Sequence, residues 1–518
     1  MDMATDMVSA ALNLPRLLSW ALAGGAMGLI LQPGFALAEP GDRSWIVEPD
    51  LNVGLTWSDN ASLASGSRQS DTTLNVDPGL SLSGRSGGAE AALKLRLNNV
   101  IYARQTDLNR TSLYGNGTGS FDLYERRLML DASASSSRER LSIFGTPAAT
   151  GYDSGGQANF QTYSLSPYWR VQGSGFNGEA RYRASWADAD SSTYQQSLRH
   201  DASLSLGSTT VKPVGWSLSG LYSLTDYRDT NDIRTASLRA TGFHALDPLL
   251  IARLIGGYEH NDYSDSASRN ALIYGGGLEW TPSPRTRMTG QIEKRFFGSG
   301  YNVDFDWRGP LSGVNMHLSR DVSTSSQTLG VGELLSLYLA QYAALASQIP
   351  DPVERARRVE RDWAARGLPA LGQGVSYISS AYYVERRAQL TGSLTGARHS
   401  LSLSTYYSQR NRLLDPALMS ASDDLSAYQR TREWGVSLYA SHSLSPRTQL
   451  NLSGTLSRSQ GEGDASTGAS TRRRSVQAGT TGTLGPHSSG AVLYRYSSSS
   501  GVSEYRENAV VANLGLHF

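Results

Sequence analysis

The stretch Leu450-Asn451-Leu452-Ser453-Gly454-Thr455-Leu456-Ser457 alternates an apolar or small residue with a polar one at every step. Successive side chains of a β-strand point to opposite faces, so this pattern predicts a strand with one apolar and one polar face. By parity Leu450, Leu452 and Leu456 share the apolar face, and Asn451, Ser453 and Thr455 share the polar face.

The same two-residue period recurs from Leu51 to the end of the chain. The repeating segments are roughly 10–15 residues long, whereas strands of soluble sandwiches usually have about 5 or 6. Strands that cross a membrane need about 9–11 residues. The length of the segments therefore favours membrane-spanning strands. Further examples lie at 51–57, 93–97, 179–186 and 303–308.

The connections between these segments alternate in kind. Short ones carry turn residues, as at 84–88, 247–248, 282–284, 309–310 and 445–447, and longer polar ones lie at 105–118, 146–158, 413–427 and 460–471. Short periplasmic turns alternating with longer extracellular loops are typical of outer-membrane barrels. We therefore expect an all-β fold, a single large antiparallel transmembrane barrel of about 22 strands, an even number as such barrels require. The weakest candidate strand is 141–145. Aromatic girdles are expected at Trp57, Trp186, Trp216, Trp280 and Trp307.

Composition excludes several classes of protein. The chain has 518 residues, of which 39% are hydrophobic, and the mean hydropathy is −0.35, so a bundle of membrane helices is excluded. There is no cysteine, which excludes disulfides, thiol catalysis and thiolate metal sites. The 47 Lys and Arg nearly balance the 46 Asp and Glu, so no nucleic-acid partner is expected.

Both ends of the chain carry export signals. Arg16 precedes an apolar stretch, and Ala36-Leu37-Ala38 forms a cleavage site, so 1–38 is expected to be a signal peptide and 39–518 the barrel. The last apolar face ends on an aromatic residue and resembles the signal read by the barrel-assembly machinery of Gram-negative bacteria: Val510, Ala512, Leu514, Leu516 and Phe518. We expect an outer-membrane location, with that machinery, membrane lipid and lipopolysaccharide as partners.

One segment, 332–367, has a helical period instead. Leu335, Leu339 and Tyr342 share one stripe, and Asp351-Pro352 forms a plausible start for a second helix. We expect a helical hairpin inside one extracellular loop, 325–376. It could be a loop ornament, a protein-docking site, or a plug or lid whose stripe of Leu335, Leu339, Tyr342 and Trp363 restricts the outer mouth.

Short motifs resemble one family. They are 349–356 (IPDPVERA), 366–369 (RGLP), Arg295-Phe296-Phe297-Gly298 with Tyr301 and 314–319, and Val47-Glu48-Pro49 with Asp59-Asn60. They are similar to outer-membrane β-barrel proteins associated with the PEP-CTERM/exosortase system. The resemblance implies a barrel found with exosortase-type sorting and exopolysaccharide production, and polysaccharide export proteins as possible partners. It carries no catalytic residues.

Polar residues on the predicted strands 303–308 and 314–319 raise the question of catalysis. Asp304 and Asp306, with Asn315, His317 and Ser319, face the lumen by parity. Two carboxylates near a histidine could activate water. Alternation alone places polar residues there, however, so we expect a structural hydrogen-bond network. No catalytic residue, metal ligand set or cofactor is expected, and the protein is not expected to be an enzyme.

Arginine is concentrated near the predicted outer rim of the last third: Arg410, Arg412, Arg430, Arg432, Arg472, Arg473 and Arg474. Guanidinium groups bind phosphate and carboxylate bidentately. These residues could form salt bridges with Asp423, Asp424 and Glu433, contact lipopolysaccharide phosphates, or form an anion-binding collar for a polymer.

Three functions fit these patterns. The first is a porin-like pore or an export and assembly component for exopolysaccharide or exosortase-sorted surface products. The second is a non-conducting scaffold of the cell envelope. The third is a solute uptake channel, against which the early start of the strands counts, because it leaves no room for an N-terminal plug domain.

Overall fold

The alternating segments form 22 antiparallel strands in one sheet. The computed structural model describes residues 44–145, 156–192, 194–210, 213–228, 232–263, 270–323, 342, 355–356, 358–359, 377–414, 419–463 and 468–518. The strands are β1 (Ser44–Ser58), β2 (Asp71–Ser86), β3 (Ala89–Tyr102), β4 (Arg110–Tyr124), β5 (Leu128–Arg140), β6 (Gln157–Gln172), β7 (Phe176–Ala189), β8 (Ser197–Ser208), β9 (Val214–Tyr227), β10 (Ile233–Asp247), β11 (Leu250–Asn261), β12 (Asn270–Ser283), β13 (Thr286–Arg295), β14 (Gly298–Arg308), β15 (Ser312–Ser323), β16 (Tyr383–Thr395), β17 (His399–Arg412), β18 (Arg430–Ser445), β19 (Thr448–Glu462), β20 (Ser470–Gly485), β21 (Ser488–Gly501) and β22 (Tyr505–His517).

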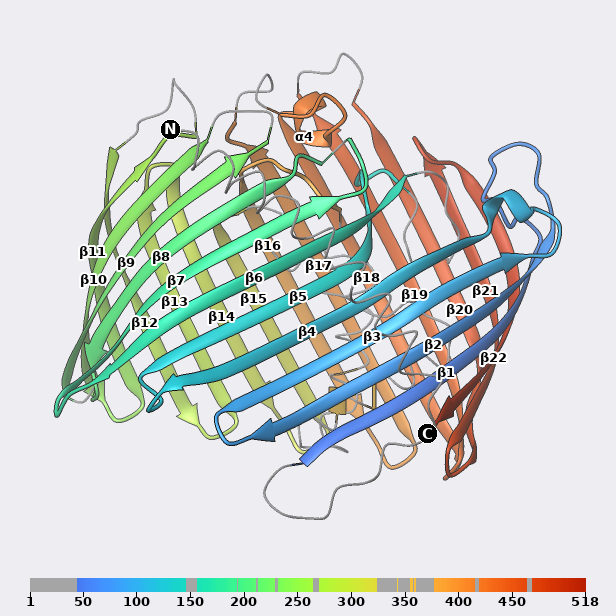
Figure 1. The fold of residues 1–518 in the computed structure, drawn as a ribbon, viewed down its shortest axis with the longest axis horizontal. Helices are drawn as coiled ribbons and strands as arrows, with labels where there is room; N and C mark the ends of the chain where they lie inside the picture. The colour runs from blue at the N-terminus through green and yellow to red at the C-terminus, as the bar shows by residue number, and fades with distance from the viewer. Residues whose placement is uncertain are drawn as a thin grey trace.

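The sheet closes on itself because β1 pairs with β22, in register from Asp50↔His517 to Ser58↔Ala509. Every other strand pairs with its neighbours in the sequence. In Figure 1 the blue β1 and the dark red β22 lie side by side, and the tilted strands form two facing walls of a barrel. Closure leaves no unpaired strand edge, which is the condition for a sheet to span a bilayer. The predicted fold class, a single closed barrel of 22 strands, is confirmed.

The two ends of the barrel differ. At one end, which we call the short-turn end, strands are joined by two to five residues. At the other, the long-loop end, most connections are longer, and they include the 3₁₀ turn η1 (Thr106–Leu108) and the short helix α4 (Asp424–Ala427). One connection there is tight: only Phe296 and Phe297 join β13 to β14, and Gly298 adopts a φ of +104°, which favours glycine.

The outer surface is apolar. Leu450 and Leu452 face outward and are 45% and 44% exposed, whereas Asn451 and Ser453 face inward and are buried. Val510, Ala512, Leu514 and Leu516 likewise lie on the outer face of β22, and the exposed Phe518 follows the strand end. Four of the expected girdle residues, Trp57, Trp216, Trp280 and Trp307, are exposed. The parity predicted for these strands is therefore confirmed, and the surface matches a lipid-facing barrel.

Residues 141–145 are turns and not the strand that we predicted. The backbone N–H of Ile143 donates to the Asp424 carboxylate at 2.7 Å instead of pairing with a strand, and Ile143 and Phe144 pack against Tyr377. The ring of 22 strands is complete without this segment.

Some predictions fall outside the described residues. The signal peptide, 1–38, lies outside them, and so does most of the helical hairpin 332–367. Of that hairpin the structure describes Tyr342, Arg355, Ala356, Arg358 and Val359, which are all helical, so the hairpin itself stays a prediction. Among the described residues no helix is long and apolar enough to cross a membrane.

Candidate functional site: the lumen and its closed outer mouth

One wall of the lumen carries charges in pairs. Arg181 lies between Asp131 and Glu179, with N–O distances of 2.8 Å to each, and its guanidinium stacks 3.8 Å from the ring centre of Tyr168. Further pairs along this wall are Arg239–Glu293 (3.4 Å), Arg253–Glu279 (3.1 Å) and Arg295–Glu259 (2.7 Å). Because each arginine has a carboxylate, this wall is strongly polar but locally close to neutral.

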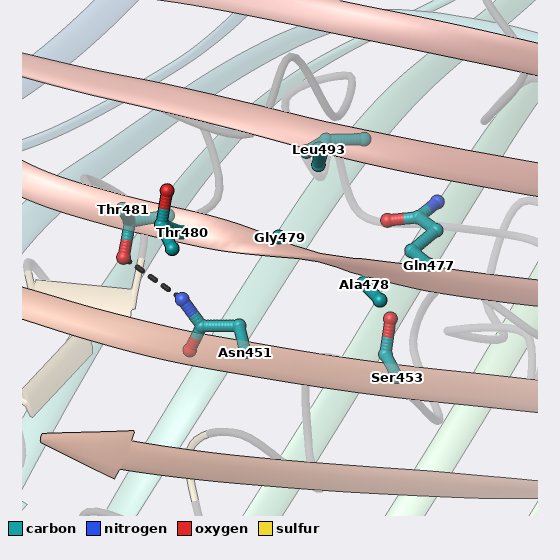
Figure 2. Close-up of a pocket in the computed structure, with 8 residues that line it drawn as sticks. All are labelled: Asn451, Ser453, Gln477, Ala478, Gly479, Thr480, Thr481 and Leu493. Atoms are coloured by element: carbon teal, nitrogen blue, oxygen red, sulfur yellow. Dashed lines mark hydrogen bonds between the residues drawn. The ribbon is translucent and has the colours of Figure 1, made fainter. Parts of the chain in front are cut away.

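The opposite wall, from β16 to β21, is lined mainly by uncharged hydroxyl and amide groups. The Tyr439 hydroxyl donates to Asn451 Oδ1 at 2.9 Å, and Asn451 Nδ2 donates to Thr481 Oγ1 at 2.8 Å. Figure 2 shows this second bond, with Gly479 between Thr481 and Gln477. A Cβ at Gly479 would collide with the carbonyl oxygen of Val492 and with Leu493, so glycine lets β21 approach closely.

The residues considered for catalysis do lie together in the lumen. Asp304 Oδ1 is 2.6 Å from His317 Nδ1, and Asn302 donates to Asp304 Oδ2 at 3.0 Å. Asn315 donates to Asp306 Oδ1 at 2.6 Å. Asp306 thus accepts from Asn315 on the neighbouring strand β15, whereas Asp304 accepts from Asn302 on its own strand and lies beside His317 of β15. The predicted hydrogen-bond network is confirmed.

Opposite walls of the barrel meet at the long-loop end. Arg140, at the end of β5, forms an ion pair with Glu433 of β18 at 3.7 Å, and both side chains are buried. The Tyr406 hydroxyl also donates to Glu433 at 3.3 Å. Strands β5 and β18 are not neighbours in the sheet, so this contact crosses the lumen.

A second buried charge pair lies beside the first. Arg410 Nε donates to Glu385 Oε1 at 3.2 Å, and Ser408 donates to the same oxygen at 2.8 Å. The Arg410 guanidinium also lies 4.6 Å from the ring centre of Tyr377 and 5.1 Å from that of Tyr383. A buried arginine is tolerated because a carboxylate and two aromatic faces compensate its charge.

The segment 377–385 is buried along its whole length and runs between the walls. Its Ile378 N–H donates to the Arg140 carbonyl oxygen at 2.9 Å, on the β5 side. Its Tyr382 hydroxyl is 2.7 Å from Thr225 Oγ1 of β9, and its Ser380 carbonyl oxygen accepts from the Tyr227 hydroxyl at 2.8 Å. Contacts with β5 and β9 on one side, and entry into β16 on the other, place this segment across the outer mouth.

Two adjacent carboxyls fix the loops above this segment. Asp423 accepts from Ser379 Oγ at 2.7 Å and caps α4 by accepting from the Leu425 N–H at 2.9 Å. Asp424 accepts from Ser142 Oγ at 2.9 Å and from the Ile143 N–H at 2.7 Å. Burial raises the pKa of Asp423 to about 6 and that of Asp424 to about 7. These carboxyls therefore titrate near neutral pH.

The arginines predicted at the rim divide into two groups. Arg410 and Arg473 point inward: Arg473 Nη2 donates to the carbonyl oxygens of Ile143 and Gly145, at 2.8 and 2.7 Å. Arg412 donates to the Leu425 carbonyl oxygen at 2.9 Å. The other four lie on the outward face: Arg430, Arg432, Arg472 and Arg474.

The salt-bridge partners proposed for these arginines differ from those in the structure. Asp423 and Asp424 bind hydroxyl and N–H groups, and Glu433 pairs with Arg140. Among the described residues, Arg410 forms an ion pair with Glu385, and Arg430 and Arg432 form ion pairs with Glu462. Arg140 and Glu433 lie far apart in the chain, and the alternation within each strand does not show which strands face each other across the lumen. Their contact therefore could not be predicted from the sequence.

The candidate lid is placed only in part. Leu335, Leu339 and Trp363 lie outside the described residues. Tyr342 lies with its ring centre 4.7 Å from the Arg355 guanidinium, and Val359 is fully buried. Arg358 lines a hollow of about 140 Å³ with Arg447, Pro486 and His517, at the short-turn end. That is the end opposite to the mouth where we expected the lid.

A further cluster, which the sequence did not predict, locks the seam between the first and last strands. Ser58 Oγ donates to Glu507 Oε1 at 3.0 Å, and Glu507 pairs with Arg495 at 3.0 Å. Asn60 Nδ2 donates to the Arg506 carbonyl oxygen at 3.0 Å, and Asp59 Oδ2 accepts from Asn508 Nδ2 at 2.7 Å. In the sequence Asp59-Asn60 belongs to one of the family-like motifs, and nothing there indicates a role at the seam.

No protein-family model matches the sequence, and no curated protein matches it. Solved structures with some likeness include the siderophore receptor PirA from Pseudomonas aeruginosa, at 10% identity and a TM-score of 0.44, covering 93% of this chain and 81% of that one. A mutant of the ferric enterobactin receptor PfeA from the same organism has 9% identity and a TM-score of 0.48, with 91% and 80% covered. The FrpB iron transporter from Neisseria meningitidis has 9% identity and a TM-score of 0.48, with 91% and 81% covered.

Proposed function

We propose that this protein is an outer-membrane channel for a hydrophilic product destined for the cell surface, closed at its outer mouth in the state described. The observation that carries this proposal is the buried polar network at the long-loop end, above a polar lumen. Arg140–Glu433 and the contacts of Asp424 with Ser142 and Ile143 join opposite walls, and Arg410–Glu385 and Asp423–Ser379 lie beside them. The closed apolar-coated barrel supports the membrane location.

The chemistry of the closure favours a gate over a permanent seal. Buried ion pairs are often no more stable than apolar side chains of similar size, because both charges lose their hydration. An apolar seal would therefore close the mouth at least as firmly. A polar network differs in that water can replace its partners when it opens. Its presence at the mouth supports reversible opening.

The lumen suggests the class of product. Paired charges on one wall and hydroxyl and amide groups on the other offer hydrogen bonds without a strong field of either sign. Such a surface suits the hydroxyl groups of a neutral or weakly charged polysaccharide better than a highly charged solute. Together with the resemblance to PEP-CTERM/exosortase-associated barrels, this supports a role in exopolysaccharide or surface-product export.

The experiment compares the wild-type chain with the variant Glu433→Gln in planar bilayers and in liposomes loaded with sugars of graded size. We expect a small or intermittent wild-type conductance, a larger one in the variant, and leakage of oligosaccharides through it. The closed mouth also fits a non-conducting scaffold. If disruption of Arg140–Glu433 never yields conductance in a folded barrel, the scaffold is the better function.

A further inference from the structure

Arginines on the outer surface of the barrel are aligned across neighbouring strands at the long-loop end. One row runs across β14–β19 in register: Tyr301, Arg320, Arg386, Gln409, Arg432 and Gln460. Just below it, Arg458 of β19 lies directly opposite Arg472 of β20. Two cross-strand pairs, Arg320↔Arg386 and Arg458↔Arg472, thus bring like charges together.

We call the outward arginines of β15–β22 the arginine belt: Arg320, Arg386, Arg430, Arg432, Arg458, Arg472, Arg474 and Arg506. Among the described strand residues of this wall, Glu462 is the one acidic side chain that faces outward. It lies 2.7 Å from Arg432 and 3.7 Å from Arg430, and both arginines stay partly exposed. The belt therefore has a large excess of positive charge.

The belt's other contacts are with neutral groups. Arg386 Nε donates to the Tyr301 hydroxyl at 2.9 Å, and Arg320 donates to the carbonyl oxygens of Phe297 and Ser299. Like charges directly opposite each other destabilise a sheet. The repulsion within these two arginine pairs is relieved when an external anion binds to both guanidinium groups of a pair on the outer face.

The belt lies where an anionic headgroup would be. Arg458 pairs in register with Trp434, and Arg474 pairs with Leu456, so the arginines directly follow the apolar band. A recess of about 410 Å³ opens between Arg320, Arg386 and Arg430, and it is also lined by the side chains of Tyr301 and Asn411. Guanidinium forks suit phosphate oxygens, and the hydroxyl and amide groups suit sugar hydroxyls.

The facing wall has no such excess. On β5–β10 the outward charged residues near the long-loop end are of both signs: Arg138, Asp188, His200, Asp226 and Arg234. His200 and Asp226 lie 3.7 Å apart. The excess of positive charge is thus confined to one side of the barrel. A general preference for arginine would have produced it on both sides, so its position indicates a binding surface.

We propose that the arginine belt binds the phosphate groups of a phosphorylated glycolipid of the outer leaflet. The inference rests on the outer-membrane location proposed above, but not on conduction. The belt holds the glycolipid on the β15–β20 side, with its acyl chains over the apolar band and its sugars against Tyr301, Gln409 and Asn411.

The test uses the full chain purified in detergent and native mass spectrometry with bisphosphorylated lipid A, with its dephosphorylated form, and with inorganic phosphate alone. The belt variants are Arg458→Gln/Arg472→Gln and Arg320→Gln/Arg386→Gln, and the matched control is Arg138→Gln/Arg234→Gln on the facing wall. Each belt variant removes two guanidinium groups and with them the charge-assisted hydrogen bonds that they donate to phosphate. We therefore expect each belt variant to bind the bisphosphorylated lipid about tenfold more weakly or worse, and the control to bind it like the wild type.

Three results would overturn the proposal: equal binding by belt and control variants, equal binding of the dephosphorylated lipid, or equally strong binding of inorganic phosphate alone. A second measurement guards against misfolding. In lipid-free detergent the belt variants should unfold at the same or a higher temperature, since repulsion is removed, and a lower temperature would assign the arginines a structural role. A wild-type chain that conducts but does not bind the bisphosphorylated lipid contradicts only this inference. A wild-type chain that binds this lipid but never conducts contradicts only the channel.

Discussion

Arg140 and Glu433 form a buried ion pair at 3.7 Å although their strands lie on opposite walls of the barrel. The contact joins the end of β5 to the start of β18 across the lumen. Neither residue has an equivalent charge of the other sign on an adjacent strand in direct register, since Arg140 pairs with Gln157 and Glu433 with Ser408 and Ser459. Their ion pair therefore depends on the mouth being closed.

Removing one partner should open the mouth. In Glu433→Gln the Arg140 guanidinium stays buried without its carboxylate, and breaking a buried pair in this way costs about 3–5 kcal/mol. We expect higher single-channel conductance and sensitivity of cells to large antibiotics. The control is Glu90→Gln, which removes the exposed Arg85–Glu90 pair and should change neither quantity. A barrel that folds but shows wild-type conductance in Glu433→Gln would contradict the gate.

Replacing both partners by apolar residues should have the opposite effect. Apolar side chains of similar volume often replace a buried ion pair at no cost in stability. We expect Arg140→Met/Glu433→Leu to lower the wild-type conductance and to slow opening, measured as open probability in planar bilayers. A double variant that conducts like Glu433→Gln would show that packing at this position does not control the mouth.

The closure should weaken as the pH rises. Burial raises the pKa of Asp423 to about 6 and of Asp424 to about 7, above the ordinary value of 3.8. The closed form thus binds more protons than the open form between about pH 4 and 7, so its stability is greatest at the acid end and is lost as pH rises through 6–7. We expect open probability to increase from pH 5 to pH 8, and Asp424→Asn to flatten this dependence. Conductance that rises on acidification would contradict the role of Asp423 and Asp424 in stabilising the closed mouth.

The barrel could be predicted from the sequence because the alternation within each strand shows which of its side chains face lipid and which face the lumen. Leu452 and Ser453 are adjacent in one strand and therefore point to opposite faces, and their polarity shows which face meets lipid. The closure could not be predicted in this way. Arg140 and Glu433 look like ordinary residues near strand ends, and Tyr377 looks like an ordinary loop residue. Only the three-dimensional approach of two walls brings them together. The error at 141–145 has the same cause, because Asp424 takes the hydrogen bond that a neighbouring strand would supply.

The outward face of β19 should not tolerate charge. Leu452 is 44% exposed on the apolar surface, and Leu452→Arg should cost about 2–4 kcal/mol if it lies near the bilayer midplane. Ala92→Arg is the matched change, because Ala92 is exposed on the lumen side of β3. Unfolding in urea from lipid vesicles measures both. Equal losses of stability would contradict the orientation of these strands.

The seam between β1 and β22 should depend on Glu507. This side chain is fully buried, accepts from Ser58 at 3.0 Å and pairs with Arg495 at 3.0 Å. Glu507→Gln leaves Arg495 without its carboxylate, and we expect a loss on the order of 3 kcal/mol. The temperature at which the folded barrel unfolds in detergent, seen as a gel-mobility change, should fall. Glu504→Gln, in the exposed loop nearby, is the control and should leave it unchanged.

The same seam has a consequence for how the protein is made. Ser58 and Glu507 are 449 residues apart, so their bond forms only after the last strand has been delivered. Before that moment β1 is an open edge, able to aggregate or to be cut by a protease. A chain that lacks either end can form neither this bond nor the β1–β22 pairing, so its sheet keeps an open edge and the barrel does not close.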